Sequence, residues 1–324
     1  MVTALRRLGF DAVYDTDFAA DLTIVEEATE LIERVKNGGV LPMITSCSPG
    51  WVEFCEHYYP EFIPNLSTCK SPQQMFGAVA KTWYAKQLGI DPKDMAVISI
   101  MPCTAKKFEV GREDQSAAGV PDVDIALTTR ELARMIQTAG LDFVNLPDED
   151  YDAPLGIDTG AGLIFGATGG VMEAALRTAY FTLKGENPPA DAFRAVRSEG
   201  FQENAGVQEA EFAIGDIKLR TAAVSGLGNT RRLLQQIERG EVHYDFVEVM
   251  ACPGGCVGGG GQPIHDGEER AFARGKKLYE LDAESELRYS HENPDIKEIY
   301  SDFFGKPMSH KAHMLLHTEH WKNN

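Results

Sequence analysis

A glycine-rich loop with two cysteines constrains this chain more than any other feature. The loop reads Cys252-Pro-Gly-Gly-Cys256 and continues with Val and four more glycines. The apolar run Phe246–Met250 just before it is typical of a short buried strand. Glycine is costly to order, so six glycines between positions 254 and 261 predict a backbone pressed close to something bulky. Two thiols on such a loop point to a metal cluster.

The remaining cysteines bear on which metal group the loop could hold. The chain has six cysteines, at positions 47, 55, 69, 103, 252 and 256. Cys47, Cys103 and Cys252 each follow a strand-like stretch, and sites of α/β proteins gather at strand ends. Spacing alone leaves three alternatives open: a structural zinc site, an iron–sulfur cubane, or thiols of the core. Zinc usually takes tight C-x₂-C pairs, whereas scattered thiolates suit a cubane, which we therefore favour.

Composition indicates a large globular protein with an acidic surface. The 324 residues are 43% hydrophobic and 25% charged, enough for one large domain or two lobes. The net charge of −18 opposes binding to nucleic acid or to anionic membranes. No apolar stretch reaches the roughly 18 residues of a membrane-spanning helix. The N-terminus has no apolar signal segment, so we expect a cytoplasmic protein whose cysteines are not in disulfides.

Strand-like and helical segments alternate, which predicts an α/β fold. Apolar runs predict strands at 95–101, 123–127 and 244–250, and a hairpin of 209–214 with 218–224. Helical spacing covers 19–36, 171–183, 229–239 and 130–139, the last with Thr129 as its N-cap. The glycines of 160–170 miss the G-x-G-x-x-G spacing and lack a P-loop Gly-Lys-Ser/Thr. We expect a packing or cluster-shielding loop there.

Three cysteine-bearing segments together resemble a known family. The segments are Thr45-Ser-Cys47-Ser-Pro-Gly-Trp51, Met101-Pro-Cys103-Thr-Ala-Lys106-Lys-Phe-Glu109 and Glu248–Pro263. In order and spacing they are similar to the three signature motifs of iron-only (FeFe) hydrogenases. The resemblance also takes in residues 71–74, 160–173, 290–293 and 304–313, so it extends over nearly the whole chain.

The resemblance implies an architecture and a cofactor. The fold would be α/β with two lobes, each a mixed sheet flanked by helices, and the metal cluster in the cleft between them. Residues 1–265 would form the catalytic domain, with the lobe boundary near 140–160, and 266–324 a helical extension packed on it. The cofactor would be the H-cluster, a 4Fe-4S cubane joined through a cysteine sulfur to a diiron unit with CO, cyanide and a bridging dithiolate. The reaction would be 2H⁺ + 2e⁻ ⇌ H₂.

Residue roles carry over motif by motif. The cubane ligands would be Cys103, Cys252 and Cys256, with the Cys256 sulfur shared with the diiron unit. Lys106 would donate a charge-assisted hydrogen bond to a cyanide. Other matching positions would pack around the diiron unit or line its pocket, the alternative for each being plain core packing; they are Met101, Met250, Pro72, Gln73 and Phe165. For Lys106 the alternative is a solvated side chain.

A dry hydrogen-cleaving site also needs a proton relay. By resemblance the relay consists of Cys47, Ser67, Glu30 and Glu27. The two glutamates are three residues apart and share one helical face. Without the resemblance, two glutamates in a charged helix would be interpreted as a solvated face.

One position departs from the family pattern. The first motif normally has adjacent cysteines, the first relaying protons and the second ligating the cubane, but here the pair is Cys47-Ser48. A serine oxygen ligates iron only when deprotonated, and an alcohol holds its proton far more tightly than a thiol of pKa about 8.5. Three outcomes are open: Ser48 ligates, Cys47 shifts to ligate, or one iron stays labile. Cys55 and Cys69 match no motif and are interpreted as packing thiols, although either could rescue the site.

The resemblance also shapes the expected partners. The family's segment beside the dithiolate bridge, and the C-x-x-C-x-x-C runs of accessory clusters, have no counterpart here. The sequence would then be a fragment, a gene read from an internal Met, or a chain that relies on a partner. Electrons would come from ferredoxin or an electron-transfer subunit, and maturation proteins would supply the diiron unit. A catalytically silent cluster-assembly relative and a hydrogen sensor are the alternatives to the enzyme.

Overall fold

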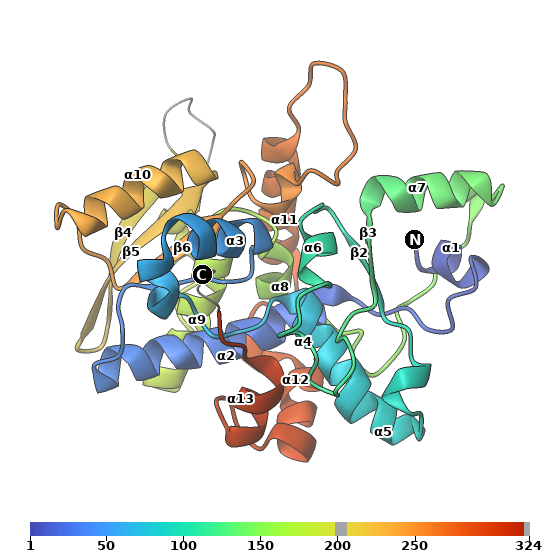
Figure 1. Ribbon diagram of the computed structural model, residues 1–324, viewed down its shortest axis with the longest axis horizontal. Helices are drawn as coiled ribbons and strands as arrows, with labels where there is room; N and C mark the ends of the chain where they lie inside the picture. The colour runs from blue at the N-terminus through green and yellow to red at the C-terminus, as the bar shows by residue number, and fades with distance from the viewer. Residues whose placement is uncertain (198–205, 321–324) are drawn as a thin grey trace.

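Two β-sheets organise the chain (Figure 1), which the computed structural model describes over residues 1–197 and 206–320. The larger sheet has the order β1-β6-β5-β4; its strands are β1 (Met43–Ile44), β4 (Val207–Ile214), β5 (Ile217–Ser225) and β6 (Phe246–Met250). The β4–β5 pair is an antiparallel hairpin, and the other pairs are parallel. The smaller sheet pairs β2 (Ile98–Met101) with β3 (Ile125–Thr128) in parallel.

Helices surround both sheets. Their bounds are α1 (Val2–Arg7), α2 (Thr16–Asn37), α3 (Pro49–Tyr58), α4 (Pro72–Val79), α5 (Ala85–Leu88), α6 (Lys106–Glu109), α7 (Thr129–Thr138), α8 (Gly160–Ile164), α9 (Gly170–Lys184), α10 (Leu227–Glu238), α11 (Ala271–Glu284), α12 (Pro294–Ile299) and α13 (His310–Leu316). None of the helices in the described ranges is long and apolar enough to span a membrane.

Helix α2 is the central support of the molecule. Its N-cap Asp15 accepts a hydrogen bond from Asp17 N at 2.9 Å, and it ends at Gly38 in the left-handed conformation, φ 73°. Between these ends the helix packs against α4, α8 and α9, so most of its first four turns are buried. Polar residues on those turns are therefore held inside the protein.

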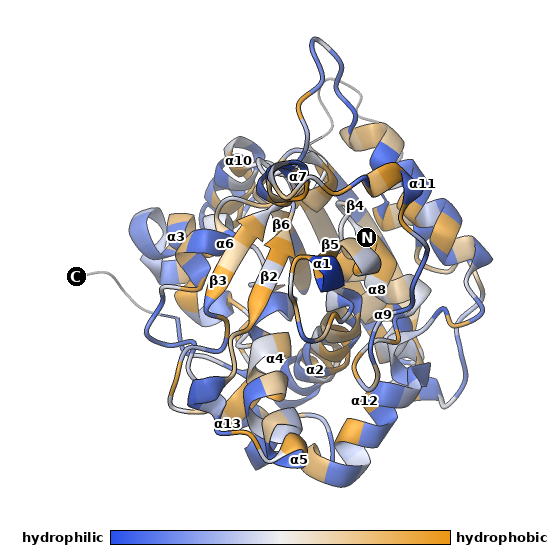
Figure 2. Cartoon of the chain, turned by 90° about the vertical axis from the view of Figure 1, so that its right-hand side faces the viewer, coloured by the Kyte–Doolittle hydropathy of each residue, from blue (hydrophilic) through white to orange (hydrophobic). Residues whose placement is uncertain are grey.

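Apolar residues cover the inner surfaces of the larger sheet on both sides. One cluster joins α2 and α9 to the sheet, and a second joins α3 and α10 to its other face. In Figure 2 the strands are largely hydrophobic, with β2 and β3 toward the viewer and helices around them. The layering of the larger sheet buries the ends of β1 and β6.

The α/β class with sheets flanked by helices is confirmed, as is the predicted hairpin. The smaller sheet consists, in the described residues, of two parallel strands. Strand β1 pairs with β6, so the two sheets are not separated by one boundary in the sequence. Helix α7 begins one residue early, because Thr128 and Glu131 form a reciprocal capping box.

The C-terminal helices lie against the rest of the chain. Helix α11 packs on α8, α12 on α2, and α13 on α4, on the lower side of Figure 1 for the last two. The final four residues of the predicted extension, 321–324, lie outside the described residues.

Candidate metal centre and proton relay

Three strands each end two or three residues before a cysteine, and the first of them is β1, which precedes Cys47. Cys103 lies two residues beyond β2 of the smaller sheet, and Cys252 two residues beyond β6 of the larger sheet. A short helical turn begins at Cys256. The glycine loop joins the two sheets directly, since Gly261 N donates to Pro102 O at 2.9 Å. We call Cys103, Cys252, Cys256 and Ser48 together the thiol cradle.

The loop glycines are required by neighbouring protein backbone. A Cβ on Gly259 would lie 2.1 Å from Pro102 O, and one on Gly261 would lie 2.8 Å from the Pro102 carbonyl carbon. A Cβ on Gly255, where φ is +95°, would lie 2.8 Å from Gly166 O. The sequence predicts a bulky neighbour for these glycines. At these three positions that neighbour is the backbone of other segments. Their effect is to fix Cys103 beside the Cys252–Cys256 loop.

The glycine-rich segment 160–170 closes the cradle from another side. Val257 N donates to Gly166 O at 3.0 Å, and Thr168 N donates to Gly254 O at 3.0 Å. The buried Glu248 carboxylate accepts from Gly169 N at 2.6 Å, at the start of α9. The segment packs against the cysteine loop, as expected for a packing or shielding role. Apart from its place in the third motif, Glu248 has no sequence signal that indicates this role.

The three cradle thiols lie within electrostatic reach of one another. Burial raises the pKa of Cys256 to about 12, with Cys103 and Cys252 adding to the rise and Lys106 opposing it. Burial is also the main cause that raises the pKa of Cys252, and the neighbouring Cys103 is the second cause. In the described residues the three sulfurs do not all lie within 4.8 Å, the spacing a single ion requires. This separation disfavours the zinc alternative and suits a larger cluster.

Ser48 lies beside the same loop. It is the N-cap of α3, yet its side chain makes no capping hydrogen bond. Its Oγ instead accepts from Ala251 N at 3.4 Å, next to Cys252. The hydroxyl is therefore close to the cradle.

Lys106 is buried and ion-paired, so the solvated alternative is wrong. Its Nζ donates to Cys47 O at 3.2 Å and to Glu109 Oε2 at 2.9 Å. Glu109 also accepts from Ser71 Oγ at 2.8 Å and from Gln73 Nε2 at 2.9 Å. Glu109 stands in the second motif, but sequence reasoning assigned it no part. It fixes both the ammonium and the Gln73 amide.

Two of the remaining pocket candidates, Phe165 and Met250, pack with Cys47, and the others lie at the ends of α4 and β2. Cys47, Phe165 and Met250 belong to one buried apolar cluster. Pro72 is buried at the first turn of α4, and Met101 is half-buried at the end of β2. Apolar surroundings suit a thiol that stays neutral: burial raises the pKa of Cys47 well above its usual range, followed by the charge of Glu27.

Glu27 and Glu30 face inward from α2, so the solvated-face alternative is wrong for both. Their exposed fractions are 1% and 4%. Burial, followed by the charge of Glu30, raises the pKa of Glu27 to about 8, and its Oε2 has no hydrogen-bond partner among the described residues. Ser67 Oγ donates to Glu30 Oε2 at 2.8 Å.

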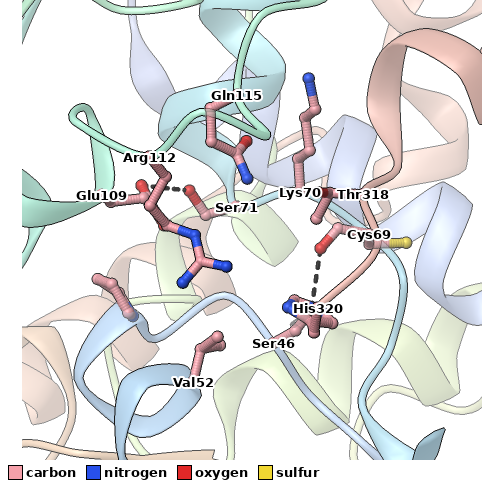
Figure 3. Close-up of a pocket in the computed structure, with 11 residues that line it drawn as sticks. Ser46, Val52, Cys69, Lys70, Ser71, Glu109, Arg112, Gln115, Thr318 and His320 are labelled. Carbon is pink, nitrogen blue, oxygen red and sulfur yellow. Dashed lines mark hydrogen bonds between the residues drawn. The ribbon is translucent and has the colours of Figure 1, made fainter. Parts of the chain in front are cut away.

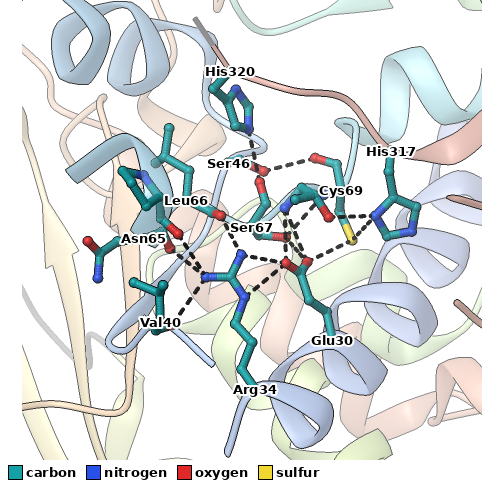
Figure 4. Close-up of polar contacts among 12 residues, drawn as sticks. Glu30, Arg34, Val40, Ser46, Asn65, Leu66, Ser67, Cys69, His317 and His320 are labelled. Atoms are coloured by element: carbon teal, nitrogen blue, oxygen red, sulfur yellow. Dashed lines mark hydrogen bonds and ion pairs between the residues drawn. The ribbon is translucent and has the colours of Figure 1, made fainter. Parts of the chain in front are cut away.

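Arg34 connects Glu30 with the surface. Its Nη2 lies 2.6 Å from Glu30 Oε1, and its Nη1 donates to the carbonyls of Val40 and Pro64 at 3.3 Å (Figure 4). Successive neighbours thus lead from the cradle to the outer end of α2. In order they are Cys47, Glu27, Ser67, Glu30 and Arg34. We call Glu27, Ser67 and Glu30 the carboxylate relay. Sequence reasoning assigned no role to Arg34, although its position four residues after Glu30 indicates a possible ion pair.

The two cysteines without a motif differ in their surroundings. Cys55 is fully buried in an apolar cluster and its thiol contacts Tyr59 O at 3.5 Å, as expected of a packing thiol. Cys69 Sγ instead lies 3.7 Å from Glu30 Oε2 and 3.9 Å from His317 Nδ1.

A small cavity of about 20 Å³ adjoins this region. Figure 3 shows Glu109, Arg112, Gln115 and His320 around it, with the Cys69 sulfur directed away from its centre.

Comparison with known proteins agrees with this geometry. Residues 1–260 match the family described as iron only hydrogenase large subunit, C-terminal domain, and residues 268–323 match the iron hydrogenase small subunit. A solved [FeFe]-hydrogenase structure, of HydA(deltaEFG), has 42% identity and a TM-score of 0.84, covering 98% of this chain and 86% of that one. The chain belongs to the iron-only hydrogenase family.

Curated relatives of this hydrogenase-family chain include enzymes and assembly factors. The NADP-reducing hydrogenase subunit HndD of Solidesulfovibrio fructosivorans is 53% identical over 99% of this chain and 55% of its own length. The periplasmic [Fe] hydrogenase large subunit of Nitratidesulfovibrio vulgaris is 47% identical over 85% and 64%. The cytosolic Fe-S cluster assembly factor narfl of Xenopus tropicalis is 31% identical over 97% and 67%. The chain therefore spans a little over half to two thirds of these relatives.

The residues present fit the family's cofactor with one exception. The solved structure reveals stepwise H-cluster assembly in an [FeFe]-hydrogenase, so the predicted H-cluster is confirmed at the level of the family. Three grouped thiols match the soft ligands of an iron–sulfur cubane. The unpartnered buried Oε2 of Glu27 is consistent with a further polar group in the pocket. The fourth cradle position offers a hydroxyl, which is a harder ligand than a thiol.

Proposed function

We propose that the chain catalyses 2H⁺ + 2e⁻ ⇌ H₂ at an H-cluster held by Cys103, Cys252 and Cys256. The observation that carries this proposal is the buried carboxylate relay, which begins beside Cys47 and ends at Arg34. A cluster that only transfers or stores iron has no use for such a path, whereas hydrogen chemistry in a dry pocket needs one.

The cluster, when bound, supplies the redox chemistry and the binding of hydrogen at iron. The protein residues position it and move the proton. Cys256 would provide the shared sulfur, and Lys106, already fixed by Glu109, would donate to a cyanide. The pocket residues would exclude water; they are Met101, Met250, Pro72, Gln73 and Phe165.

The proton would pass between Cys47 and Glu27, then through the Ser67 hydroxyl to Glu30. A carboxyl with a pKa of about 8 can be protonated or ionised near neutral pH, which suits Glu27 to this task. Glu30 accepts from Ser67 on one side and Arg34 on the other. Arg34 would orient Glu30 and lead to solvent.

Ser48 would be the fourth cubane ligand, which leaves Cys47 free for the relay. Its hydroxyl is not used as a helix cap and lies next to the Cys252 segment. Cys47, by contrast, belongs to the apolar cluster that includes Phe165 and Met250. The change Ser48→Ala should then alter the electron paramagnetic resonance spectrum of the reduced cubane, and Cys47→Ala should leave the cubane spectrum intact. The reverse pattern would assign Cys47 as the ligand.

The proposal extends to partners and organisation. Electrons would enter from ferredoxin or a partner subunit, maturation proteins would insert the diiron unit, and the protein would work in the cytoplasm. Residues 1–265 would form the catalytic domain and 266–324 an extension on its surface. The match of residues 268–323 to a small-subunit family supports an extension that other members carry on a separate chain.

Infrared spectroscopy after anaerobic maturation tests the proposal. CO and cyanide bands together with hydrogen evolution from a reduced dye are the expected result. A protein that holds a cubane but shows no CO or cyanide bands would instead fit the second candidate function, cluster assembly, which the 31% identity to narfl supports. Bands with hydrogen binding but negligible turnover would point to the sensor.

A further inference from the structure

Three different metal-binding side chains meet beside the relay, away from the thiol cradle. They are Glu30 of α2, Cys69 of the loop before α4, and His317 just after α13 (Figure 4). One ligand atom from each lies within 4.8 Å of the other two, and all three residues are buried. Carboxylate oxygen, thiolate sulfur and imidazole nitrogen are all ligands of zinc and of similar divalent metals.

The distances match a tetrahedral ion. Zn–S bonds are about 2.3 Å and Zn–N or Zn–O bonds about 2.0 Å, so a sulfur and its neighbouring ligand atom should be about 3.5 Å apart. Cys69 Sγ lies 3.7 Å from Glu30 Oε2 and 3.9 Å from His317 Nδ1. Movements of a few tenths of an ångström would bring the sulfur to this spacing from both neighbours, whose own ligand atoms lie within 4.8 Å of each other. A water would complete the tetrahedron.

The backbone already holds two of the ligands opposite each other. Cys69 and His317 form an antiparallel bridge. Lys70 N donates to Leu316 O at 2.9 Å, and Thr318 N donates to Thr68 O at 2.8 Å. Ligands fixed in this way lose little conformational freedom when a metal binds.

The histidine is also oriented as a metal ligand. His317 Nε2 lies 3.2 Å from Glu26 Oε2, and a carboxylate can only accept, so Nε2 carries the proton. That tautomer leaves the Nδ1 lone pair directed at Cys69 and at Thr68 Oγ1, which is 2.8 Å away. A carboxylate behind the distal nitrogen is the usual outer support of a metal-bound histidine.

Glu30 already accepts hydrogen bonds from other residues, and a metal would have to share its carboxylate with these donors. Arg34, Ser67 and Thr68 N all donate to its two oxygens. Thr68 N is shared between the two oxygens at 3.2 Å each, so a metal at Oε2 would leave this donor on Oε1, while Oε2 keeps its contact with Ser67. Two anionic ligands, Glu30 and the Cys69 thiolate, would balance a divalent charge, with the thiol proton released to solvent.

We infer that Glu30, Cys69 and His317 form a second metal site, for Zn²⁺ or a similar divalent ion, and that its occupation blocks the relay at Glu30. The blocking part rests on the proposed hydrogenase function; the metal site does not. A bound ion would hold the Glu30 carboxylate by its lone pair and exclude the proton from it.

Zinc absorption spectroscopy on the cluster-loaded protein tests the site directly, because iron does not contribute at the zinc edge. We expect one equivalent of Zn²⁺ retained after gel filtration, with one sulfur at about 2.3 Å and nitrogen or oxygen at about 2.0 Å. Cys69→Ser, close in size to the original, should remove the sulfur. Cys55→Ser, at the other buried cysteine without a motif, should leave it. The metal site is overturned if the zinc spectrum of the parent shows no sulfur ligand, or if the sulfur ligand is still present in Cys69→Ser.

Dye-linked hydrogen evolution, measured on the same samples, tests the blocking. One equivalent of Zn²⁺ should lower turnover at least tenfold in the parent and in Cys55→Ser, with no effect on Cys69→Ser, and a chelator should restore the rate. If turnover stays at its full rate while the zinc is bound to sulfur, the blocking of the relay is overturned and the metal site itself still stands. If the matured protein shows no CO or cyanide bands, the hydrogenase proposal fails, and the zinc spectra still decide the metal site.

Discussion

The thiol cradle and the carboxylate relay are neighbours that are held in place by different means. In the cradle, backbone meets backbone: Gly261 N bonds to Pro102 O, and Val257 N bonds to Gly166 O. In the relay, side chains from separate elements bond to one another, as Ser67 does to Glu30. A backbone contact tolerates no added atom, whereas a side-chain contact can be removed with the fold intact. Substitutions in the cradle should therefore abolish cofactor binding, and those in the relay should abolish proton movement alone.

The largest effect is expected for Gly259→Ala. The new Cβ would lie 2.1 Å from Pro102 O, so the loop must move away from Cys103. We expect loss of the cubane and about 1–3 kcal/mol of stability, the usual cost of overpacking. Iron content after anaerobic reconstitution and thermal unfolding measure the two effects.

Gly260→Ala is the matched control, since its nearest neighbour would be the Thr104 side chain at 3.3 Å. It should bind normal amounts of iron. Equal iron contents in the two variants would show that the glycines do not hold the cradle together.

The next effect in size is expected for Glu30→Gln. An amide cannot take up and release the proton, so turnover should fall about 100-fold or more, within the usual range for a lost acid–base group. The infrared bands of the cluster should stay unchanged, because Glu30 does not contact the cradle in the described structure. The exposed Glu33 on the same helix supplies the control Glu33→Gln, with full activity expected. Loss of the cluster bands in Glu30→Gln would mean that relay and cradle are not independent.

An effect on stability alone distinguishes buried from exposed ion pairs around the second motif. Lys106→Met leaves the Glu109 carboxylate buried without its cation, which should cost about 3–5 kcal/mol. Lys107→Met breaks the half-exposed pair with Glu131 and should cost no more than about 1 kcal/mol. Denaturant unfolding of the two variants checks the difference. Similar losses would indicate that the Lys106 pair is no more protected from water than its neighbour.

The same contrast explains what could be predicted from sequence. The cysteines of the cradle were found because strand ends and glycine spacing are local signals, and the α/β class followed from alternating segments. The relay glutamates were assigned only through the family resemblance, since their burial depends on α4, α8 and α9 packing around α2. Cys69 received no role because its partner, His317, lies 248 residues away in the chain. No periodicity connects such a pair.

The last expected effect, a change in how stability varies with pH, comes from Glu27. Its pKa is raised from an ordinary value of 4.5 to about 8, so the folded protein holds this proton more tightly than the unfolded chain. The resulting stability is fully present below about pH 4.5 and is lost as the pH rises toward 8. Each pKa unit corresponds to about 1.4 kcal/mol, so Glu27→Gln, which removes that loss, should be up to about 5 kcal/mol more stable than the parent at pH 9 and within about 1 kcal/mol of it at pH 5. Thermal unfolding of the cluster-loaded proteins at both values measures this, with Glu33→Gln as the exposed comparison. A constant difference between the two pH values would mean that Glu27 is ionised throughout, and the relay would then need another proton acceptor next to Cys47.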